Sequence, residues 1–163
     1  MSTKSSAATT ARWLNPDEER AWRAFRGMVT ALQAGTARDL TAVGLSESDY
    51  EVLSTLSERP DQTSTLREQA AKMAWSRSRL SRHATRMEAR GLVRRAPDPA
   101  DGRGCLLTLT EHGLDTLKDA APAHVASVRR HFVDRLTPDD LAALEHIAAK
   151  LEGTGGGTDD GVD

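Results

Sequence analysis

The spacing of apolar residues changes from a helical to a strand-like period at Gly91, and this change constrains the fold more than any other feature of the chain. Before Gly91, Ser76 can cap a helix in which Leu80, Ala84 and Met87 recur on one face. After it, two strand-like segments, residues 92–95 and 105–110, flank a turn-rich segment over residues 97–104. The pattern therefore predicts a helix over residues 76–91 followed by a β-hairpin with a long basic tip.

Five further helices are predicted from capping signals and apolar periodicity. Asn15-Pro16-Asp17-Glu18 offers a cap, a proline at the first helical position and an early acid, and similar Ser or Thr caps precede most of the others. Gly35 is a candidate kink in the first helix and Pro122 a candidate bend in a later one. The predicted helices run from Pro16 to about Val43, from Glu47 to before Pro60, from Leu66 to Met73, from Glu111 to Leu136, and from Pro138 to Leu151.

These elements predict a mainly α (α+β) protein with one domain. A chain of 163 residues with 38% hydrophobic residues can form one substantial core, and its 4% aromatic content favours helices built on Leu, Val, Ala and Met. We expect the domain over residues 15–152, with flexible tails over 1–14 and 153–163. Without a long apolar run or a secretion signal, the chain is expected to be cytoplasmic.

Eight cations fall between Lys72 and Arg95, against the single acid Glu88, although the whole chain has a net charge of −2. On the predicted helix, Arg79, Arg82 and Arg86 form a stripe away from the apolar face. Such a stripe is often only a solvated surface. Here it has almost no interleaved acid and lies between a capped turn and a hairpin, which favours a surface that meets nucleic-acid phosphates.

Two short helices, a tight turn, an arginine-rich helix and a hairpin form a winged helix-turn-helix. The chain resembles the multiple antibiotic resistance regulator (MarR) family from about Trp13 to Leu151. The motifs that carry the resemblance are GLSESDY at residues 44–50, WSRSRLS at 75–81, MEARGLV at 87–93 and DGRGCLLTLT at 101–110. The resemblance implies a winged core over about 46–110, dimerisation helices over about 16–43 and 111–152, and a homodimeric transcription regulator that binds an inverted repeat in double-stranded DNA.

The family pattern implies which residues contact DNA. Base edges in the major groove are assigned to Ser78 and to Arg79 or Arg82, because an arginine can form two parallel hydrogen bonds with guanine. In the hairpin, Arg103 is expected in the minor groove, with Asp101 either orienting it or bracing the wing, although an Asp-Gly turn chosen only for its geometry is the alternative. The remaining expected contacts, largely with the major groove and phosphates, are Ser76, Arg77, Ser81, Arg86, Arg94 and Arg95.

Apolar residues outside the winged core predict dimerisation, because three helices around a small domain would otherwise leave a large apolar face uncovered. Packing within one chain is the alternative. The expected interface residues are Trp22, Phe25, Val29, Val125, Val128, Phe132, Leu141, Leu144 and Ile147.

A small aromatic or phenolic effector is implied by the resemblance, with Trp22, Arg26 and Tyr50 as candidate wall residues, although a tryptophan on an apolar face is more often core. No cofactor is predicted. Four late histidines, His112, His124, His131 and His146, lack metal-ligand spacing, so no metal site is predicted. The only cysteine, Cys105, lies in the hairpin rather than on the first helix, where peroxide-sensing relatives carry theirs.

The sequence contains no pattern typical of an enzyme, since it lacks paired catalytic carboxylates, a nucleophile with a base, and a phosphate-binding glycine loop. The hypothesis is therefore a dimeric, ligand-responsive repressor. A winged-helix protein-interaction module, a MarR-type activator and a redox-responsive regulator remain the alternatives.

Overall fold

The computed structural model describes residues 11–153, so most of both predicted tails lies outside the described part of the chain. The described chain falls into two compact units, one ending at Ala34 and the other beginning at Gly35. Helix α1 (Pro16–Ala42) is continuous through this boundary, and Asn15 Oδ1 accepts hydrogen bonds from the backbone N–H groups of Asp17 and Glu18 at 2.9 Å, as expected for its cap. None of the described helices has the length and apolar character that a membrane crossing requires.

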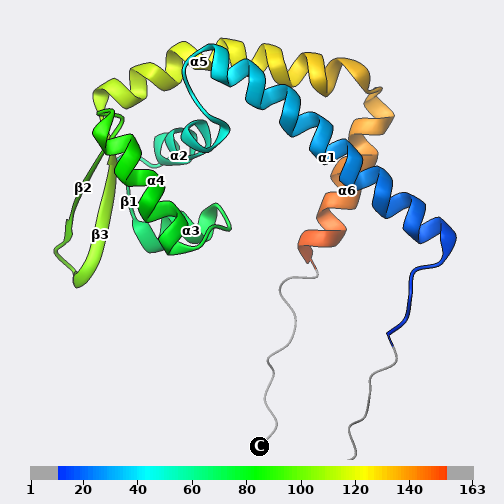
Figure 1. Ribbon diagram of the computed structural model, residues 1–163, viewed down its shortest axis with the longest axis horizontal. Coiled ribbons are helices and arrows are strands. Elements are labelled where there is room, and N and C mark those ends of the chain that lie inside the picture. Colours follow the sequence, from blue (N-terminus) through cyan, green and yellow to red (C-terminus); the bar gives the residue numbers. More distant parts are fainter. Residues whose placement is uncertain (1–10, 154–163) are drawn as a thin grey trace, which may run out of the picture. The chain divides into compact units, whose positions relative to one another are not determined.

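The second unit contains the winged core and the late helices (Figure 1), and it confirms the mainly helical fold class. Ser46, Thr65 and Thr137 each form a capping box with an acid three residues later, which explains where three of its helices begin. Its elements are α2 (Glu47–Ser57), β1 (Thr63–Thr65), α3 (Leu66–Lys72), α4 (Arg77–Ala89), β2 (Val93–Asp98), β3 (Asp101–Leu109), α5 (Glu111–His131), the 3₁₀ helix η1 (Val133–Arg135) and α6 (Pro138–Glu152).

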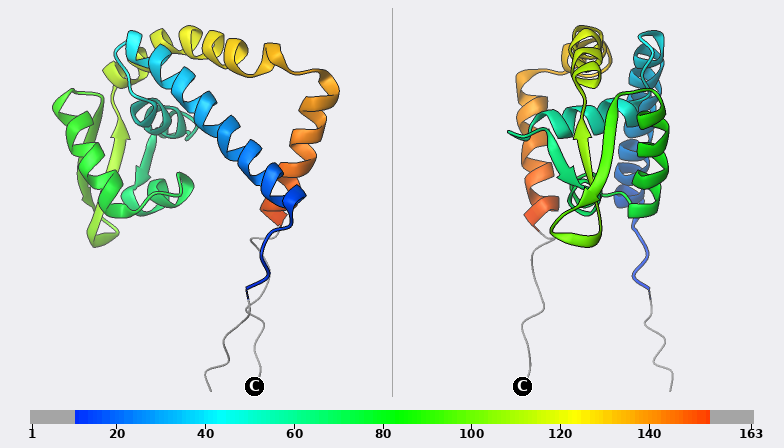
Figure 2. Two further views of the ribbon diagram at one scale, coloured as in Figure 1. Left: turned by 45° about the vertical axis from the view of Figure 1, so that its right-hand side comes forward. Right: turned by 90° about the vertical axis from the view of Figure 1, so that its left-hand side faces the viewer.

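The sheet has three antiparallel strands in the order β1-β3-β2. The hairpin of β2 and β3 is the predicted wing, and it lies beside α4 in both views of Figure 2. Strand β1 was not predicted. It pairs Thr63 with Thr108 and Thr65 with Leu106, and so joins the segment before α3 to the base of the wing.

Two predicted boundaries are wrong. The wing has no long tip: the strands extend to Asp98 and from Asp101, and the Asp98 carboxylate accepts a hydrogen bond from the Ala100 N–H at 2.9 Å, which closes a tight turn. Helix α5 ends at His131 rather than at Leu136, since Phe132 leaves the helical conformation and η1 follows. Pro122 lies inside α5, as predicted.

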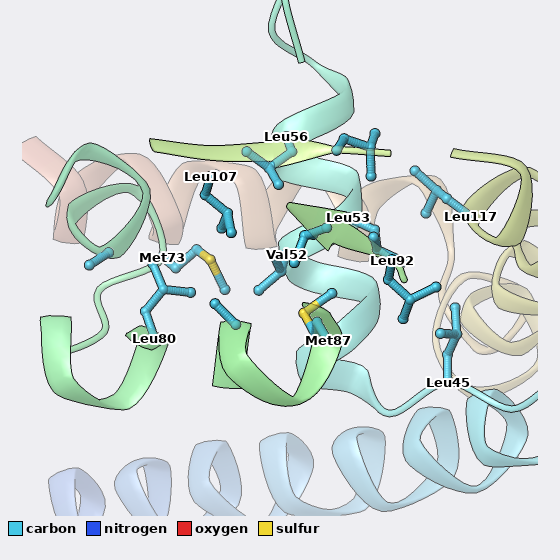
Figure 3. Close-up of a cluster of buried hydrophobic side chains, with 14 of the residues drawn as sticks. Leu45, Val52, Leu53, Leu56, Met73, Leu80, Met87, Leu92, Leu107 and Leu117 are labelled. Carbon is cyan, nitrogen blue, oxygen red and sulfur yellow. The ribbon is translucent and has the colours of Figure 1, made fainter. Parts of the chain in front are cut away.

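The core is one cluster of aliphatic side chains between α2, α4 and the sheet (Figure 3). Leu80, Ala84 and Met87 of α4 are fully buried, which confirms the apolar face that their spacing predicts. They pack in the same cluster as Val52, Leu53 and Leu56 of α2 and Leu107 of β3. Burying a leucine or methionine side chain contributes about 1.5–3 kcal/mol, so this packing fixes which face of α4 points outward.

The carboxylate of Asp39, near the C-terminal end of α1, joins this helix to α5. Asp39 Oδ2 accepts hydrogen bonds from Ser127 Oγ at 2.5 Å and from Arg130 Nη2 at 2.6 Å, and it lies 3.0 Å from His131 Nε2. The hydrogen bonds from Ser127 and Arg130 lower the pKa of Asp39 to about 2. The ionised carboxylate of Asp39 is therefore the form that holds α1 and α5 together.

The turn between α3 and α4 contains a non-glycine residue in the left-handed region, Ala74, with φ of 51°. The Ala74 N–H bonds to the Ala71 carbonyl and the Trp75 N–H to the Ala70 carbonyl, so Ala74 occupies the position after the helix end where glycine is favoured. Glycine does occupy the corresponding position after α1, at Gly44, and after α4, at Gly91.

Replacing Ala74 by glycine is expected to raise the free energy of unfolding by about 0.5–1 kcal/mol and the melting temperature by about 2 °C, because the left-handed strain exceeds the added entropy of the unfolded chain. Denaturant and thermal melts would measure this. The matched control is Ala71→Gly, an exposed helical position in α3, which is expected to lose about 1 kcal/mol. A loss of stability for Ala74→Gly would contradict the prediction.

Candidate nucleic-acid interface

Helix α4 presents a polar, cationic face opposite its buried face. Ser76 caps it by accepting a hydrogen bond from the Arg79 N–H at 3.2 Å, and Ser76 Oγ lies 3.2 Å from Ser78 Oγ. The exposed residues of this face are Arg77, Ser78, Arg79, Arg82, Thr85 and Arg86, while Ser81 is half-buried. The predicted stripe is thus present, and it lies on the helix that follows the tight turn.

Trp75 provides a support for one of these arginines. The Arg79 guanidinium carbon lies 3.7 Å from the Trp75 ring centroid, which is a stacked cation–π arrangement. The stack limits the orientations of the Arg79 guanidinium but does not neutralise its charge. Arg79 therefore keeps its hydrogen-bonding edge for an external partner.

Three of the eight cations in the basic segment are paired with acids of the same chain. Lys72 pairs with Glu58, Arg90 Nη1 lies 2.8 Å from Asp49 Oδ2, and Arg95 Nε lies 2.9 Å from Glu88 Oε2. Within residues 11–153, the other five form no ion pair with a carboxylate, and all five are exposed. These five are Arg77, Arg79, Arg82, Arg86 and Arg94. They leave a concentrated positive charge on the surface of α4 and at the start of the wing.

Arg95 differs from its expected role as a phosphate contact. Its backbone N–H and its Nε each donate a hydrogen bond to the Glu88 carboxylate at 2.9 Å, and its side chain is half-buried. These bonds, first the backbone one and then the side-chain one, lower the pKa of Glu88 below its usual value. The pair fastens β2 to α4, so Arg95 positions the wing.

The tip of the wing carries the pair Asp101 and Arg103 at the start of β3. Asp101 and Gly102 are exposed. Gly104 must remain small, because a Cβ there would lie 2.8 Å from the Asp98 Cβ. In the sequence, Arg103 stands between two glycines, Gly102 and Gly104.

A hollow of about 700 Å³ separates the wing tip from the beginnings of α3 and α4. Arg67 and Arg77 line it from the helices, and Asp98, Asp101 and Cys105 line it from the wing. The structure thus brings Arg77 and Asp101 to one hollow. Cys105 is half-buried, with its Sγ 3.5 Å from the Leu106 carbonyl oxygen.

Asp49 of α2 is buried beneath the cationic face. Burial would raise its pKa, but hydrogen bonds from the Ser46 N–H and from Arg90 outweigh burial and lower it. Arg90 also donates to the Gly44 carbonyl at 2.9 Å, which ties the end of α4 to the start of α2. His83 Nε2 lies 3.0 Å from the other Asp49 oxygen.

The three candidate effector residues lie in different units. Trp22 and Arg26 are exposed on α1, where the Trp22 ring stacks on Phe25 with centroids 5.9 Å apart. Tyr50 lies on α2, where its ring packs on His124 with centroids 4.1 Å apart, and burial raises the pKa of Tyr50.

The candidate dimerisation residues are only partly covered. Trp22, Phe25, Val125 and Ile147 are about half exposed, at 51%, 47%, 55% and 51%, and α6 contains no buried residue. The remaining ones, Val29, Val128, Phe132, Leu141 and Leu144, are of intermediate burial. Among the described residues, no cluster of His, Cys, Asp or Glu has the geometry of a metal site.

Sequence reasoning missed four residues that organise this surface, namely Trp75, His83, Asp49 and Glu88. Glu88 offered a signal, since it is the lone acid in a cationic segment and an arginine follows in the next strand. Trp75 was visible in the turn motif, but the guanidinium stacked on it was not. Asp49 was visible only within the motif at residues 44–50.

The known proteins to which the chain is similar are transcriptional regulators. The MarR family profile matches residues 43–104. The transcriptional regulator HosA of Escherichia coli O111:H- is 30% identical over 130 residues, which make up 79% of this chain and 94% of HosA.

Two solved structures from Streptomyces coelicolor agree with this match. AbsC, a MarR family transcriptional regulator, is 44% identical with a TM-score of 0.78, and the match covers 88% of this chain and 99% of AbsC. Sco3205, a MarR family transcriptional regulator solved in complex with DNA, is 34% identical with a TM-score of 0.84 over 94% of this chain and 97% of its own. The similarity therefore extends over nearly the whole length of each relative.

Proposed function

The chain belongs to the MarR family of DNA-binding transcriptional regulators, and from this premise we propose that it is a homodimeric repressor released from an inverted-repeat operator by a small aromatic or anionic molecule. As a member of that family it is a regulator and not an enzyme, as predicted. The observation that carries the proposal is the group of five exposed arginines on α4 and the start of the wing, which form no ion pair with a carboxylate within residues 11–153. Bound over a promoter, such a protein blocks transcription.

In this proposal α4 enters the major groove and the wing reaches the neighbouring minor groove. Ser78 and Arg79 or Arg82 read base edges, and the stack on Trp75 supports Arg79 for this role because it orients a planar donor. Arg103 occupies the minor groove, with Asp101 beside it. The other contacts, mainly with phosphates, are made by Ser76, Arg77, Ser81, Arg86 and Arg94. Arg95 acts on the wing through Glu88.

Dimerisation is supported by the exposure of the apolar residues on α1, α5 and α6. A 15-residue helix such as α6 is only marginally stable alone, and this helix buries no residue against its own chain. A second copy of the chain would cover its apolar stripe of Leu141, Leu144 and Ile147. Two winged cores related by a twofold axis then match an operator whose halves are inverted repeats.

Replacing Ile147 by aspartate is expected to convert the dimer into a monomer, because it places a charge in the apolar contact of both copies. Light scattering after size exclusion should show a mass of 17.7 kDa instead of twice that value. The control is Ala142→Asp, on the opposite side of α6, which should remain dimeric. An unchanged mass for Ile147→Asp would contradict the proposed interface.

The effector part of the proposal concerns Trp22 and Arg26 of α1, whose indole and guanidinium suit a flat anion, and Tyr50 of α2 as a separate candidate. A thermal-shift screen of aromatic acids should find compounds that raise the melting temperature, because a ligand that binds the folded state stabilises it. A compound that raises the melting temperature should also release the bound DNA. Stabilisation without release would remove the ligand-response part of the proposal.

The main test is selection of duplexes from a random-sequence pool by the purified protein. We expect enrichment of an inverted repeat whose half-site centres lie about one helical turn apart, roughly 10 base pairs. Enrichment of single half-sites would contradict the dimeric reading mode. Placing the selected duplex over a promoter in a transcription assay should lower transcript yield, whereas a rise would identify an activator.

A further inference from the structure

The imidazole of His83 connects two arginines of the α4 face, Arg79 and Arg86, to the core. His83 is 7% exposed, so it lies under the cationic face rather than on it. The Trp75 ring meets it edge-on, with centroids 5.7 Å apart and planes at 81°, and Trp75 in turn carries Arg79. On its other side His83 reaches Arg86, whose Nη2 lies 2.9 Å from His83 Nδ1.

The contacts of the two ring nitrogens fix the form of this histidine. A guanidinium can only donate hydrogen bonds, so His83 Nδ1 must be the acceptor for Arg86. In a neutral imidazole the proton then lies on Nε2, which is 3.0 Å from Asp49 Oδ1. Asp49 is itself held by the Ser46 N–H and by Arg90, so the whole series of contacts is anchored in α2.

Arg86 is held in place by this arrangement without losing its function. It donates from Nη2 to His83 and from Nη1 to the Arg82 carbonyl oxygen at 3.3 Å. A guanidinium has five N–H donors, so three of them remain available to a DNA base or phosphate. Orienting the side chain in advance lowers the conformational entropy that binding would otherwise cost.

We propose that neutral His83 is a positioning residue for sequence-specific DNA recognition, which orients Arg86 directly and Arg79 through Trp75, and that its protonation weakens discrimination between specific and non-specific DNA. This inference rests on the proposed placement of the α4 face on DNA.

The direction of the pH effect follows from the groups around the ring. Burial lowers the pKa of His83 below its usual value, Asp49 of α2 opposes that change, and Arg86 and Arg79 of α4 add to it. The ring is therefore neutral at pH 7. As the pH falls through the pKa, a proton on Nδ1 replaces the acceptor with a donor in front of Arg86, so the guanidinium is repelled. Non-specific binding, which depends on total positive charge, does not weaken in acid.

Two substitutions separate the two ring nitrogens. In His83→Asn, the amide oxygen can occupy the position of Nδ1 and accept from Arg86 at every pH. In His83→Gln, the longer amide reaches toward Asp49 and leaves no acceptor near Arg86. The probes are the duplex selected from the random pool and calf thymus DNA, and the quantity measured is the ratio of the two affinities between about pH 7.5 and about pH 5.

For the unchanged protein, we expect the ratio to fall about tenfold on acidification, in keeping with loss of one hydrogen bond to a charged group. His83→Asn should keep a high ratio that does not change with pH. His83→Gln should have a ratio about tenfold lower at pH 7.5 that also stays constant, with unchanged affinity for calf thymus DNA as evidence of folding. A ratio for His83→Gln equal to that of the unchanged protein, or the same pH dependence in His83→Asn, would overturn the inference.

Nitrogen-15 NMR of the unchanged protein provides a readout that does not require a variant to fold. The expected spectrum at neutral pH has the His83 proton on Nε2, and a proton on Nδ1 would overturn the inference. If the pool yields no enriched duplex, the proposed function fails and this inference fails with it. If a duplex is enriched but the His83 variants match the unchanged protein, only the inference fails.

Discussion

Replacing Arg79 by alanine is expected to lower the affinity for the selected duplex by about 100- to 1,000-fold. A bidentate arginine contact with guanine contributes about 1–3 kcal/mol of discrimination, and a dimer makes it twice. The loss for calf thymus DNA should be much smaller, because only one cation per chain is removed. Fluorescence anisotropy with both DNAs at one salt concentration would measure the two effects.

Two further variants show which property of Arg79 matters. Arg79→Lys keeps the positive charge but cannot form two parallel hydrogen bonds, so it should recover little of the specific affinity. Lys118→Ala is the control, since it removes an exposed cation from α5, away from the α4 face, and should bind as the unchanged protein does.

Arg103→Ala tests the wing in the same assay, and the loss of affinity is expected mainly for duplexes with A·T-rich flanks. Unchanged binding for both Arg79→Ala and Arg103→Ala would remove the proposed reading mode.

The second large effect is expected from salt. If a dimer contacts about eight phosphates, raising the salt concentration from about 50 mM to about 200 mM should weaken DNA binding roughly 10⁴-fold through counterion release. In each chain, the five exposed arginines of α4 and the start of the wing supply enough cations for that number of contacts. The slope of a plot of log affinity against log salt concentration gives the number of phosphates that the dimer contacts.

Arg82→Ala provides the internal check on this slope, because it removes one cation from each chain of the dimer. The slope should become shallower by about two units if both copies contact phosphates. A winged helix that binds proteins instead of DNA would show weak salt dependence and no enriched duplex. A slope near zero would therefore contradict DNA recognition by this surface.

The helices of the fold were predictable because their signals are local. Ser46, Thr65, Ser76 and Thr137 each bond to a backbone group within three residues, so the sequence alone indicates where a helix begins. The buried face of α4 was predictable for the same reason, since its period places Leu80 and Met87 together.

What escaped prediction depends on partners distant in the sequence. Strand β1 has only three residues and no apolar alternation, and it is a strand because β3 lies beside it. The sequence does not distinguish Arg95 from its neighbour Arg94, because only the fold brings Arg95 to Glu88. His83 looked like an ordinary helix residue, because its role depends on Asp49 of another helix. The DNA contacts of the individual arginines stay predictions.

The link between Glu88 and Arg95 has a consequence for how the protein behaves in acid. The hydrogen bonds from Arg95 lower the pKa of Glu88 below its usual value, so its carboxylate stays ionised and keeps the wing attached to α4 in mild acid. Mild acidification therefore preserves the backbone framework that carries the arginines of α4. In the proposal above, a regulator whose His83 is protonated would remain bound to the chromosome but spread over many sites, so that fewer copies occupy its own promoters.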